Sequence, residues 1–317
     1  MLSLGLWVLL SRVQPTSIES QLAAIEAKAK GKLGVAIIRP GSATYLHKND
    51  RFAVESVMKM VVSMAVLEEV DKGRWTLDQP ILFRRTDLSV SVQPLAELLG
   101  KRDRMNVTLR QCIELTVTQS CSASGDFMVR KLGGISKINA FLRRHGIAGM
   151  SIDRQERDLQ TGVIGLKWKD AYLDPKVFDA DVARTPKSVQ DAAFKRYLKE
   201  TRDTTTPAAM GDLLLKLVKG QLLSAKSTAF LLGVMERTET GADRLPAGVP
   251  SGWKLAHKTG TSRTWQGVNC ATNDVGVVRN SKGEWVVLVA LLRGSTASAD
   301  DRAAALAGVA RTALGGR

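Results

Sequence analysis

The chain has 317 residues and a formal net charge of +15 at pH 7, because 46 Lys and Arg outnumber 31 Asp and Glu. Apolar residues make up 44% and charged residues 24%, which is typical of a soluble globular protein and excludes a disordered chain. The positive charge would suit nucleic acid, an anionic envelope surface or an anionic small substrate. The basic residues are scattered and aromatic residues make up only 5%, so a nucleic-acid partner is not expected and a solvated basic surface is favoured.

Cysteine and histidine are scarce, at three residues each. No CxxC pair occurs, so a zinc site is not expected. Because the cysteine count is odd, at least one of Cys112, Cys121 and Cys270 is predicted to be a free thiol, and the pairing of the other two stays open. Residues 2–10 are apolar but too few to span a membrane. They are either the core of a remnant or mis-started secretory signal, whose preceding basic residues are missing, or a segment leading into a helix.

The first quarter of the chain predicts helix, strand and helix in turn. Residues 17–30 carry apolar side chains at helical spacing, with Ser17 or Ser20 as the cap. Residues 33–38 form an apolar run that predicts a buried strand, followed after a Pro-Gly turn by a second strand. Residues 56–72 are helical and apolar almost all round, which is typical of a helix buried in the core.

The rest of the chain changes from helices to strands. Residues 74–240 predict helices joined by polar loops, whereas the tail predicts strands at 253–261, 272–279 and 284–292 with a hairpin turn at 280–283, and then a helix at 299–314. Strands from both ends and helices between them predict an α/β fold of the α+β sandwich type. We expect a five-stranded antiparallel sheet with flanking helices, formed by residues 17–55 and 237–317. An all-helical domain, residues 56–236, would be inserted into it.

Ser56 and Lys59 form the first candidate for chemistry. Positions three apart on a helix lie on one face, so the ammonium would sit beside the hydroxyl. A desolvated lysine can activate a serine, and the start of a helix favours developing negative charge. The same four-residue spacing recurs at Ser251 and Lys254, in a turn. Ser56 differs because it opens a long buried helix.

A second candidate lies on the strand near the carboxyl terminus, where residues 257–261 read His-Lys-Thr-Gly-Thr. Lys258, the hydroxyls of Thr259 and Thr261, and the close backbone at Gly260 can together hold a substrate carboxylate and its acyl oxygen. The alternative is an edge strand that lysine protects from pairing.

These motifs, in this order, resemble those of class A serine β-lactamases and penicillin-binding proteins. The resemblance covers residues 17–314. Further blocks similar to class A landmarks lie at residues 132–134, 202–210, 252–254 and 272–274. The resemblance implies that Ser56 is the nucleophile and Lys59 its proton-transfer partner. It also implies that Lys258 and Thr259 bind the substrate carboxylate, and that the backbone N–H groups of Ser56 and Thr261 form the oxyanion hole.

Residues 152–160 resemble the start of the family's omega loop, whose glutamate activates the deacylating water. Glu156 falls on that position, and its alternative is an exposed acid in a charged stretch. Gln160 stands where the family usually has asparagine, so it would meet the water from a different place. Arg154 and Asp203 match the pair that ties the neck of the loop, where we expect a bidentate bridge.

Between this pair the chain carries about thirty-five extra residues, roughly 166–200, which are rich in aromatics. We predict a helix at residues 188–199. The insertion is either a lid or flap near the site or a packing decoration.

The family's Ser-Asp-Asn triplet reads Ser120-Cys121-Ser122 in this chain. Ser120 can still shuttle a proton to the leaving nitrogen, whereas Ser122 lacks the amide that would contact substrate and lysine. Asp126 replaces an asparagine that braces the omega loop, and a second acid near Glu156 would raise the pKa of one of the two.

An arginine that reaches the substrate carboxylate is expected before the strand that carries Lys258. Arg244 is the candidate, with a surface arginine as the alternative, because Thr272 occupies the other place that the family uses. The cleft mouth, near Ser91 and Val92, lacks the aromatic that the family often has.

The expected activity is hydrolysis of a β-lactam amide through an acyl-Ser56 intermediate, without metal or cofactor. Two alternatives are a D-alanyl peptidase or other acyl-serine hydrolase, and a non-catalytic β-lactamase-like binding protein, which the Ser120-Cys121-Ser122 triplet would favour. The expected partner is a small β-lactam or related acyl substrate. The resemblance further implies a periplasmic or secreted bacterial protein, and we expect a monomer.

Overall fold

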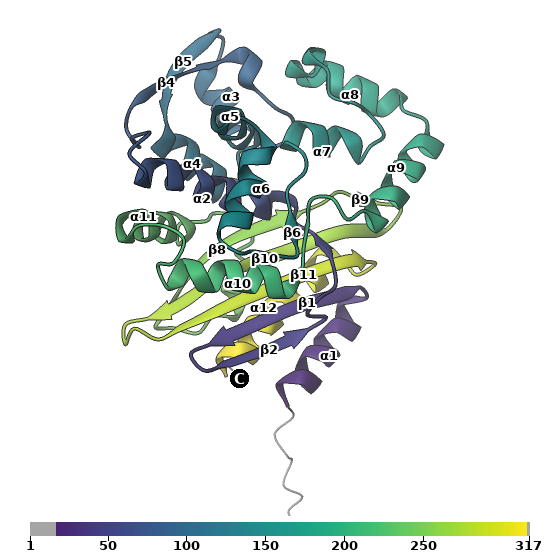
Figure 1. Ribbon diagram of the computed structural model, residues 1–317. Coiled ribbons are helices and arrows are strands. Elements are labelled where there is room, and N and C mark those ends of the chain that lie inside the picture. Colours follow the sequence, from purple (N-terminus) through teal and green to yellow (C-terminus); the bar gives the residue numbers. More distant parts are fainter. Residues whose placement is uncertain (1–16, 316–317) are drawn as a thin grey trace, which may run out of the picture.

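An antiparallel sheet joins the two ends of the chain in the computed structural model, which describes residues 17–315 (Figure 1). The amino-terminal strand β1 pairs with the carboxyl-terminal strand β11 in the middle of this sheet, with Ala36 opposite Val289. All five predicted strands are present, and the two-residue strand β9 (Thr264–Trp265) pairs with β10 as a sixth. The order of the five is β2 (Ser42–Leu46), β1 (Lys32–Arg39), β11 (Trp285–Ser295), β10 (Val268–Asn280) and β8 (Trp253–Thr261).

Helices cover both faces of this sheet. Successive residues of β1 point to opposite faces, as the two-residue period of a strand requires. Ile37 therefore packs with the terminal helices α1 (Ile18–Ala29) and α12 (Ala299–Leu314), whereas Ala36 packs with α10 (Pro207–Val218). Ser17 caps α1 by accepting from the Ser20 amide, as the sequence predicts.

The helical lobe is built around α2 (Met58–Asp71), whose residues 58–68 are all buried, as predicted. The helix was expected to begin at Ser56, but a short 3₁₀ helix, η1 (Glu55–Val57), comes first. The rest of the lobe comprises α3 (Pro94–Leu99), α4 (Leu109–Thr118), α5 (Ser122–Leu132), α6 (Ile135–Arg144), α7 (Glu156–Gly162), α11 (Ala225–Met235) and a short 3₁₀ turn, η2 (Arg85–Asp87). Another 3₁₀ turn, η4 (Leu245–Gly248), lies against α12 in the sheet domain.

The expectation of an all-helical insert is wrong at two places. Strands β4 (Pro80–Arg84) and β5 (Arg104–Thr108) form a hairpin, with Phe83 opposite Met105. Alternate residues of both strands face the core, which a strand permits and a helix does not. A second small sheet pairs β3 (Phe52–Ala53), β7 (Thr204–Thr205) and β6 (Met150–Ser151).

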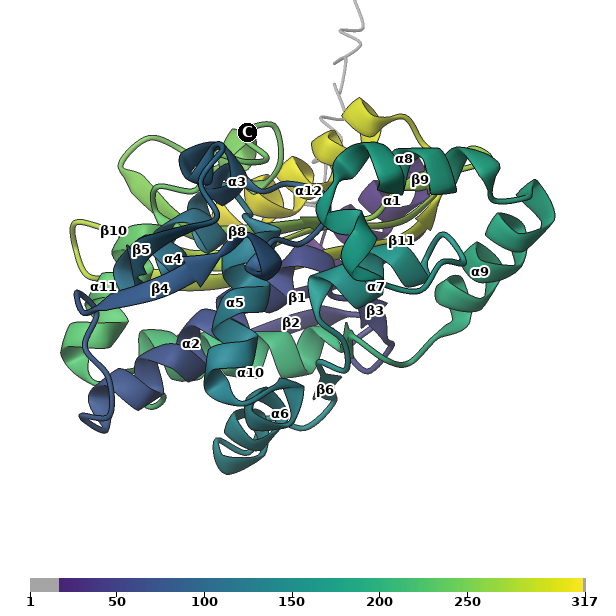
Figure 2. The same ribbon diagram turned by 90° about the horizontal axis from the view of Figure 1, so that it is seen from above.

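The insertion forms η3 (Asp170–Leu173), α8 (Pro175–Arg184) and α9 (Lys187–Lys199), so the predicted helix at 188–199 is confirmed. Figure 2 shows α8 and α9 at the margin of the molecule beside α7. The indole N–H of Trp265 donates to Asp191 on α9 at 2.6 Å. Phe194 and Tyr197 are buried in a cluster with residues of α7 and β10. The insertion is therefore packed against the sheet margin through α9.

Candidate active site

Lys59 lies one turn after Ser56, and its ammonium is surrounded by oxygens. Its Nζ lies 3.0 Å from Ser56 Oγ and 3.1 Å from Glu156 Oε1. It also donates to the carbonyl oxygen of Ser120 at 2.7 Å, to Ser120 Oγ at 3.3 Å and to Ser122 Oγ at 3.2 Å. Because Lys59 is only 1% exposed, these contacts take the place of water around a buried charge.

The turn that carries Ser56 has a strained backbone that a neighbouring strand holds in place. Glu55, the preceding residue, has φ +47°, a left-handed conformation that only surrounding contacts can maintain in a non-glycine residue. Asn273 Nδ2 donates to the carbonyl oxygen of Ala53 at 2.8 Å and fixes the chain entering the turn.

Gly260 lets strand β8 approach this turn closely. A Cβ at Gly260 would lie 2.7 Å from the Val54 carbonyl oxygen and 3.2 Å from Glu55 Cβ. The sequence predicted that this glycine admits the substrate to the main chain. The contacts instead explain it by the close approach of β8 to Val54 and Glu55, the residues before Ser56.

We expect Gly260→Ala to lower kcat/KM about 10- to 100-fold, because the added methyl group must push β8 away from the Ser56 turn and misplace the reacting groups. Gly233→Ala is the matched control, since a Cβ at Gly233 in α11 meets nothing within 4 Å. Steady-state kinetics of both variants, with thermal unfolding of each, measure the effect. Equal kcat/KM in Gly260→Ala and wild type would refute this role of Gly260.

Glu156 opens α7 and points at the serine. Ser56 Oγ donates to Glu156 Oε1 at 3.2 Å, so one carboxylate oxygen contacts both Ser56 and Lys59. Glu156 is 1% exposed, which excludes the alternative of a surface acid. The other oxygen, Oε2, accepts from Gln160 Nε2 at 3.2 Å. The longer side chain of Gln160 therefore still reaches the carboxylate from the next turn of the helix.

Asp126 braces the start of α7 as the sequence predicts. Its Oδ1 accepts from the Glu156 amide at 2.7 Å, and its Oδ2 accepts from the Arg157 amide at 3.0 Å and from Ser89 Oγ at 2.7 Å. The pKa of Asp126 is raised to about 6. Burial is the larger cause, and repulsion from Glu156, the cause that the sequence suggested, is the smaller.

Ser120 links the two lysines of the site. It has φ +59°, and its hydroxyl oxygen accepts from Lys258 Nζ at 3.1 Å as well as from Lys59. Ser122 keeps the contact to Lys59 that the missing amide would have made. Cys121 is fully buried in the main core, where it fills space.

Lys258 and Thr259 lie on β8 opposite Ser56. Lys258 is buried and also donates to the Thr259 carbonyl oxygen at 3.0 Å. Burial, together with the charge of Lys59, lowers the pKa of Lys258 to about 7. The hydroxyl groups of Thr259 and Thr240 are hydrogen-bonded at 2.6 Å, so Thr240 joins this side of the site.

Arg244 lies against the end of β8, which excludes a free surface arginine. It donates to Thr261 Oγ1 at 2.7 Å and to the carbonyl oxygen of Asn273 at 3.0 Å. Burial lowers its pKa. Thr272 accepts from Arg302 Nε at 3.1 Å, so a second guanidinium, from α12, lies beside the position where the family places its alternative arginine.

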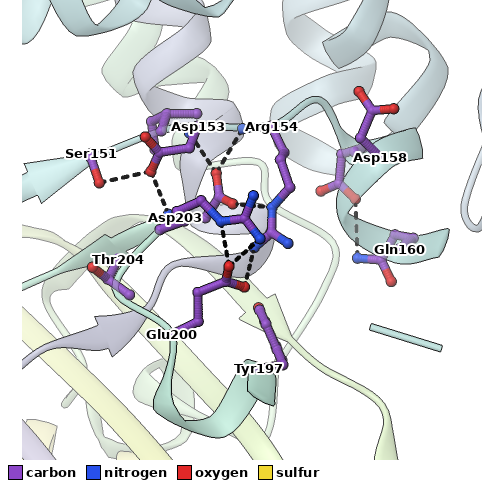
Figure 3. Close-up of polar contacts among 12 residues, drawn as sticks. Ser151, Asp153, Arg154, Asp158, Gln160, Tyr197, Glu200, Asp203 and Thr204 are labelled. Carbon is purple, nitrogen blue, oxygen red and sulfur yellow. Dashed lines mark hydrogen bonds and ion pairs between the residues drawn. The ribbon is translucent and has the colours of Figure 1, made fainter. Parts of the chain in front are cut away.

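The neck of the omega loop is tied at Arg154, but the predicted bidentate bridge to Asp203 is wrong. Arg154 Nε donates to Asp203 Oδ2 at 2.6 Å, whereas its NH2 group donates to Glu200 at 2.8 Å (Figure 3). The other oxygen of Asp203 is occupied by the amides of Asp153 and Arg154. The enlarged loop supplies Glu200, so the Arg154 guanidinium binds two different carboxylates, one through each of two nitrogens.

The remaining predicted features lie away from this site. Ser251 of the duplicate motif is in an exposed turn, and Val92 is exposed at the cleft mouth. Within residues 17–315 the three cysteines are free and buried, and no cluster of three or more His, Cys, Asp or Glu residues could hold a metal. No helix in that range is long and apolar enough to span a bilayer. The apolar residues 2–10 lie outside the described part of the chain.

The comparison with known proteins agrees with this geometry. The model of the "Beta-lactamase enzyme family" matches residues 17–315. The chain belongs to the β-lactamase enzyme family. It is 28% identical to the β-lactamase VEB-1 of Pseudomonas aeruginosa over 91% of this chain and 86% of that one, and 29% identical to a β-lactamase of Citrobacter koseri over 85% and 79%.

Solved structures identify the class within the family. An ancestral class A β-lactamase matches with a TM-score of 0.76 and 28% identity, over 94% of this chain and 99% of that one. A β-lactamase from Chitinophaga pinensis matches with a TM-score of 0.77 and 27% identity, over 94% and 98%. The chain is therefore a class A serine β-lactamase, and the predicted family and fold class are confirmed.

Five residues near the site of this β-lactamase were missed as functional candidates, and one of them is Thr240, the partner of Thr259. Asn273 lay within a recognised block but had no assigned role, and Arg302 lies on a helix that the sequence treats as packing. Glu55 and Tyr197 are far apart in the sequence, yet Tyr197 Oη donates to Glu55 Oε1 at 2.5 Å. Only the adjacency of Glu55 to Ser56 could have drawn attention to this pair.

Proposed function

We propose that this β-lactamase opens the β-lactam amide by attack of Ser56 Oγ on the carbonyl carbon. The observation that carries the assignment is the position of Ser56 Oγ, 3.0 Å from Lys59 Nζ and 3.2 Å from Glu156 Oε1. One of these groups takes the hydroxyl proton as the bond to the carbonyl carbon forms. Ser120, in contact with both lysines, returns a proton to the leaving nitrogen.

The opposite wall of the site supports binding of a substrate carboxylate. Lys258, Thr259 and Arg244 present an ammonium, a hydroxyl and a guanidinium along the end of β8. Charge-assisted hydrogen bonds of this kind orient an anionic substrate. The backbone N–H groups of Ser56 and Thr261 would stabilise the oxyanion. The excess positive charge of the chain agrees with a carboxylate-bearing substrate.

Deacylation requires a water held against the acyl carbon. Glu156 contacts Ser56 through one oxygen and Gln160 through the other, which supports a role for Glu156 as the base that activates this water. A D-alanyl peptidase lacks such an acid, and a decayed binding protein has no need to keep Lys59 in contact with both Ser120 and Ser122. Both alternatives are therefore disfavoured.

A chromogenic cephalosporin tests the assignment. We expect multiple turnovers by the wild type, and an intact mass that returns to that of the free protein when substrate is exhausted. No turnover and no adduct would overturn the proposal. A stable adduct without turnover would instead support the peptidase-like alternative.

The low pKa of Lys258 predicts a pH-dependent KM. Below about pH 7 the free enzyme carries Lys258 as an ammonium, and above it as a neutral amine, so affinity for a carboxylate falls as the pH rises. We expect KM for a penicillin to rise about tenfold between pH 6.5 and 8.5. The methyl ester of the same penicillin, which carries no carboxylate, is the matched control and should show a flat KM. The same rise with the ester would contradict the assignment.

We further propose that the enzyme acts as a monomer in the periplasm or outside the cell. The family membership supports the compartment. We also propose the domain division into residues 17–55 with 237–317, and 56–236, because α2 begins where the chain leaves the sheet and Ser56 stands at that boundary.

A further inference from the structure

Glu55, the residue before the nucleophile, is a buried carboxyl that the proposed reaction does not use. It is 2% exposed. Its Oε1 accepts from Tyr197 Oη at 2.5 Å, and its Oε2 accepts from Gln160 Nε2 at 3.5 Å. Both partners belong to the omega loop. The carboxyl therefore joins the Ser56 turn to the loop.

The single amide nitrogen of Gln160 bridges two carboxyl groups. It lies 3.2 Å from Glu156 Oε2 and 3.5 Å from Glu55 Oε2. The side chain of Gln160 has three rotatable bonds and is one methylene longer than the usual asparagine, so it needs an anchor to keep one orientation. Glu55 supplies that anchor, and Tyr197 holds Glu55.

Tyr197 comes from the part of the chain that enlarges the loop. Its ring is buried with Ala53, Leu159 and Cys270, and Arg154 at the neck of the loop stacks over it at 5.9 Å (Figure 3). The phenol is thus fixed by packing on α9, and α9 is fixed to the sheet margin by Asp191. Through this hydroxyl the insertion contacts the residue that precedes Ser56.

We propose that Glu55 and Tyr197 are positioning residues for deacylation, which hold the Gln160 amide against Glu156 so that the water is presented to the acyl carbon. This inference rests on the proposed roles of Ser56 and Glu156. It assigns the enlarged omega loop a function in the chemistry, and it explains how the enzyme works with glutamine at this position.

The ionisation of Glu55 gives the pair a measurable signature. Burial raises the pKa of Glu55 to about 7, and the carboxylates of Glu156 and Asp203 contribute, while the hydrogen bonds from Tyr197 and Gln160 oppose the rise. The other titratable groups around this pair are the buried thiol of Cys270 on β10, whose pKa is raised well above its ordinary value, and Asp126 and Lys258, which interact with Glu156 and have pKa values of about 6 and about 7. A titration near pH 7 sensed at the Gln160 amide therefore reports Glu55 only where it disappears when Glu55 is replaced.

The first test removes only the hydroxyl group, in Tyr197→Phe. Tyr172→Phe is the matched control, because Tyr172 is a buried tyrosine of the same insertion whose hydroxyl donates to Asp181 at 3.0 Å. Acylation and deacylation rates with a chromogenic cephalosporin are measured separately by stopped flow. We expect deacylation to slow at least fivefold in Tyr197→Phe with acylation unchanged, and neither rate to change in Tyr172→Phe.

The second test separates positioning from stability in the double variant Glu55→Met/Tyr197→Phe. Replacing both partners of a buried polar pair by apolar groups of similar shape is commonly neutral or stabilising. We expect an unfolding midpoint equal to or above that of the wild type, together with deacylation at least tenfold slower. Should this variant fail to fold, Tyr197→Phe, which keeps the packed ring, decides the question.

Deacylation within twofold of the wild type in both variants would overturn the proposal, and so would an equal slowing of acylation. A readout without substrate keeps this inference separate from the proposed function. The NMR signal of the ¹⁵N-labelled side-chain amide of Gln160 is assigned by its absence in Gln160→Met. Its chemical shift should change with a midpoint near pH 7 in the wild type, and this change should be absent in Glu55→Met. A wild type without turnover would refute the proposed function, and the amide titration would then decide whether Glu55 holds Gln160.

Discussion

Ser56→Ala is expected to lower kcat with a chromogenic cephalosporin by at least about 10⁴-fold and to abolish any covalent adduct. Among residues 17–315, the Ser56 hydroxyl is the group that contacts both Lys59 Nζ and Glu156 Oε1 and can form an acyl bond. Loss of the nucleophile removes the covalent pathway itself, and residual rate then comes from binding and the oxyanion hole alone. The measurement combines steady-state turnover with intact mass after exposure to substrate.

Ser251→Ala is the matched control for this variant, because Ser251 and Lys254 repeat the spacing of Ser56 and Lys59 in an exposed turn. We expect it to retain wild-type turnover. Retention of turnover by Ser56→Ala would place the nucleophile elsewhere.

Glu156→Gln is expected to separate the two halves of the reaction. The amide keeps the size of the side chain but cannot accept a proton from water, so deacylation should slow about 10³-fold, within the range for loss of a general base. The variant should then accumulate an acyl-enzyme that the wild type turns over. Stopped-flow absorbance and quenched-sample mass spectrometry follow the adduct with time.

Asp158→Asn is the matched control on the same helix, because Asp158 lies two residues further along α7. The hydrogen bonds and ion pairs of Ser56 and Lys59 within residues 17–315 do not include Asp158. We expect it to deacylate at the wild-type rate. Slowing of acylation and deacylation to the same extent in Glu156→Gln would show that Glu156 acts mainly on the serine.

Most of the fold could be predicted from the sequence because its elements have strong local signals. The continuous apolar run of β1, the turn at residues 280–283 and the largely apolar helix α2 each follow from the hydrophobic pattern and the turn residues. The hairpin of β4 and β5 was missed because both strands are only five residues long, and the apolar run of β4, residues 81–83, does not alternate with polar residues as Met105 and Val107 do in β5.

The site was predictable where its residues lie within short motifs. Ser56 with Lys59, and Lys258 with Gly260, are recognisable because their spacing alone brings them to one face or one strand. Glu55 and Tyr197 are separated by 142 positions, and no periodic pattern in the sequence predicts their contact. The contact of Arg154 with a second acid could not be predicted either, because Glu200 comes close to Arg154 only after the insertion folds back through α9.

The most direct test of the central claim locates the adduct on the chain. Glu156→Gln is incubated with a cephalosporin, digested with trypsin, and the peptide of residues 52–59, which follows Arg51 and ends at Lys59, is sequenced by tandem mass spectrometry. We predict that the added mass lies on Ser56 and on no other residue. An adduct on a different side chain, or turnover by the wild type with no adduct in this variant, would contradict the proposed mechanism.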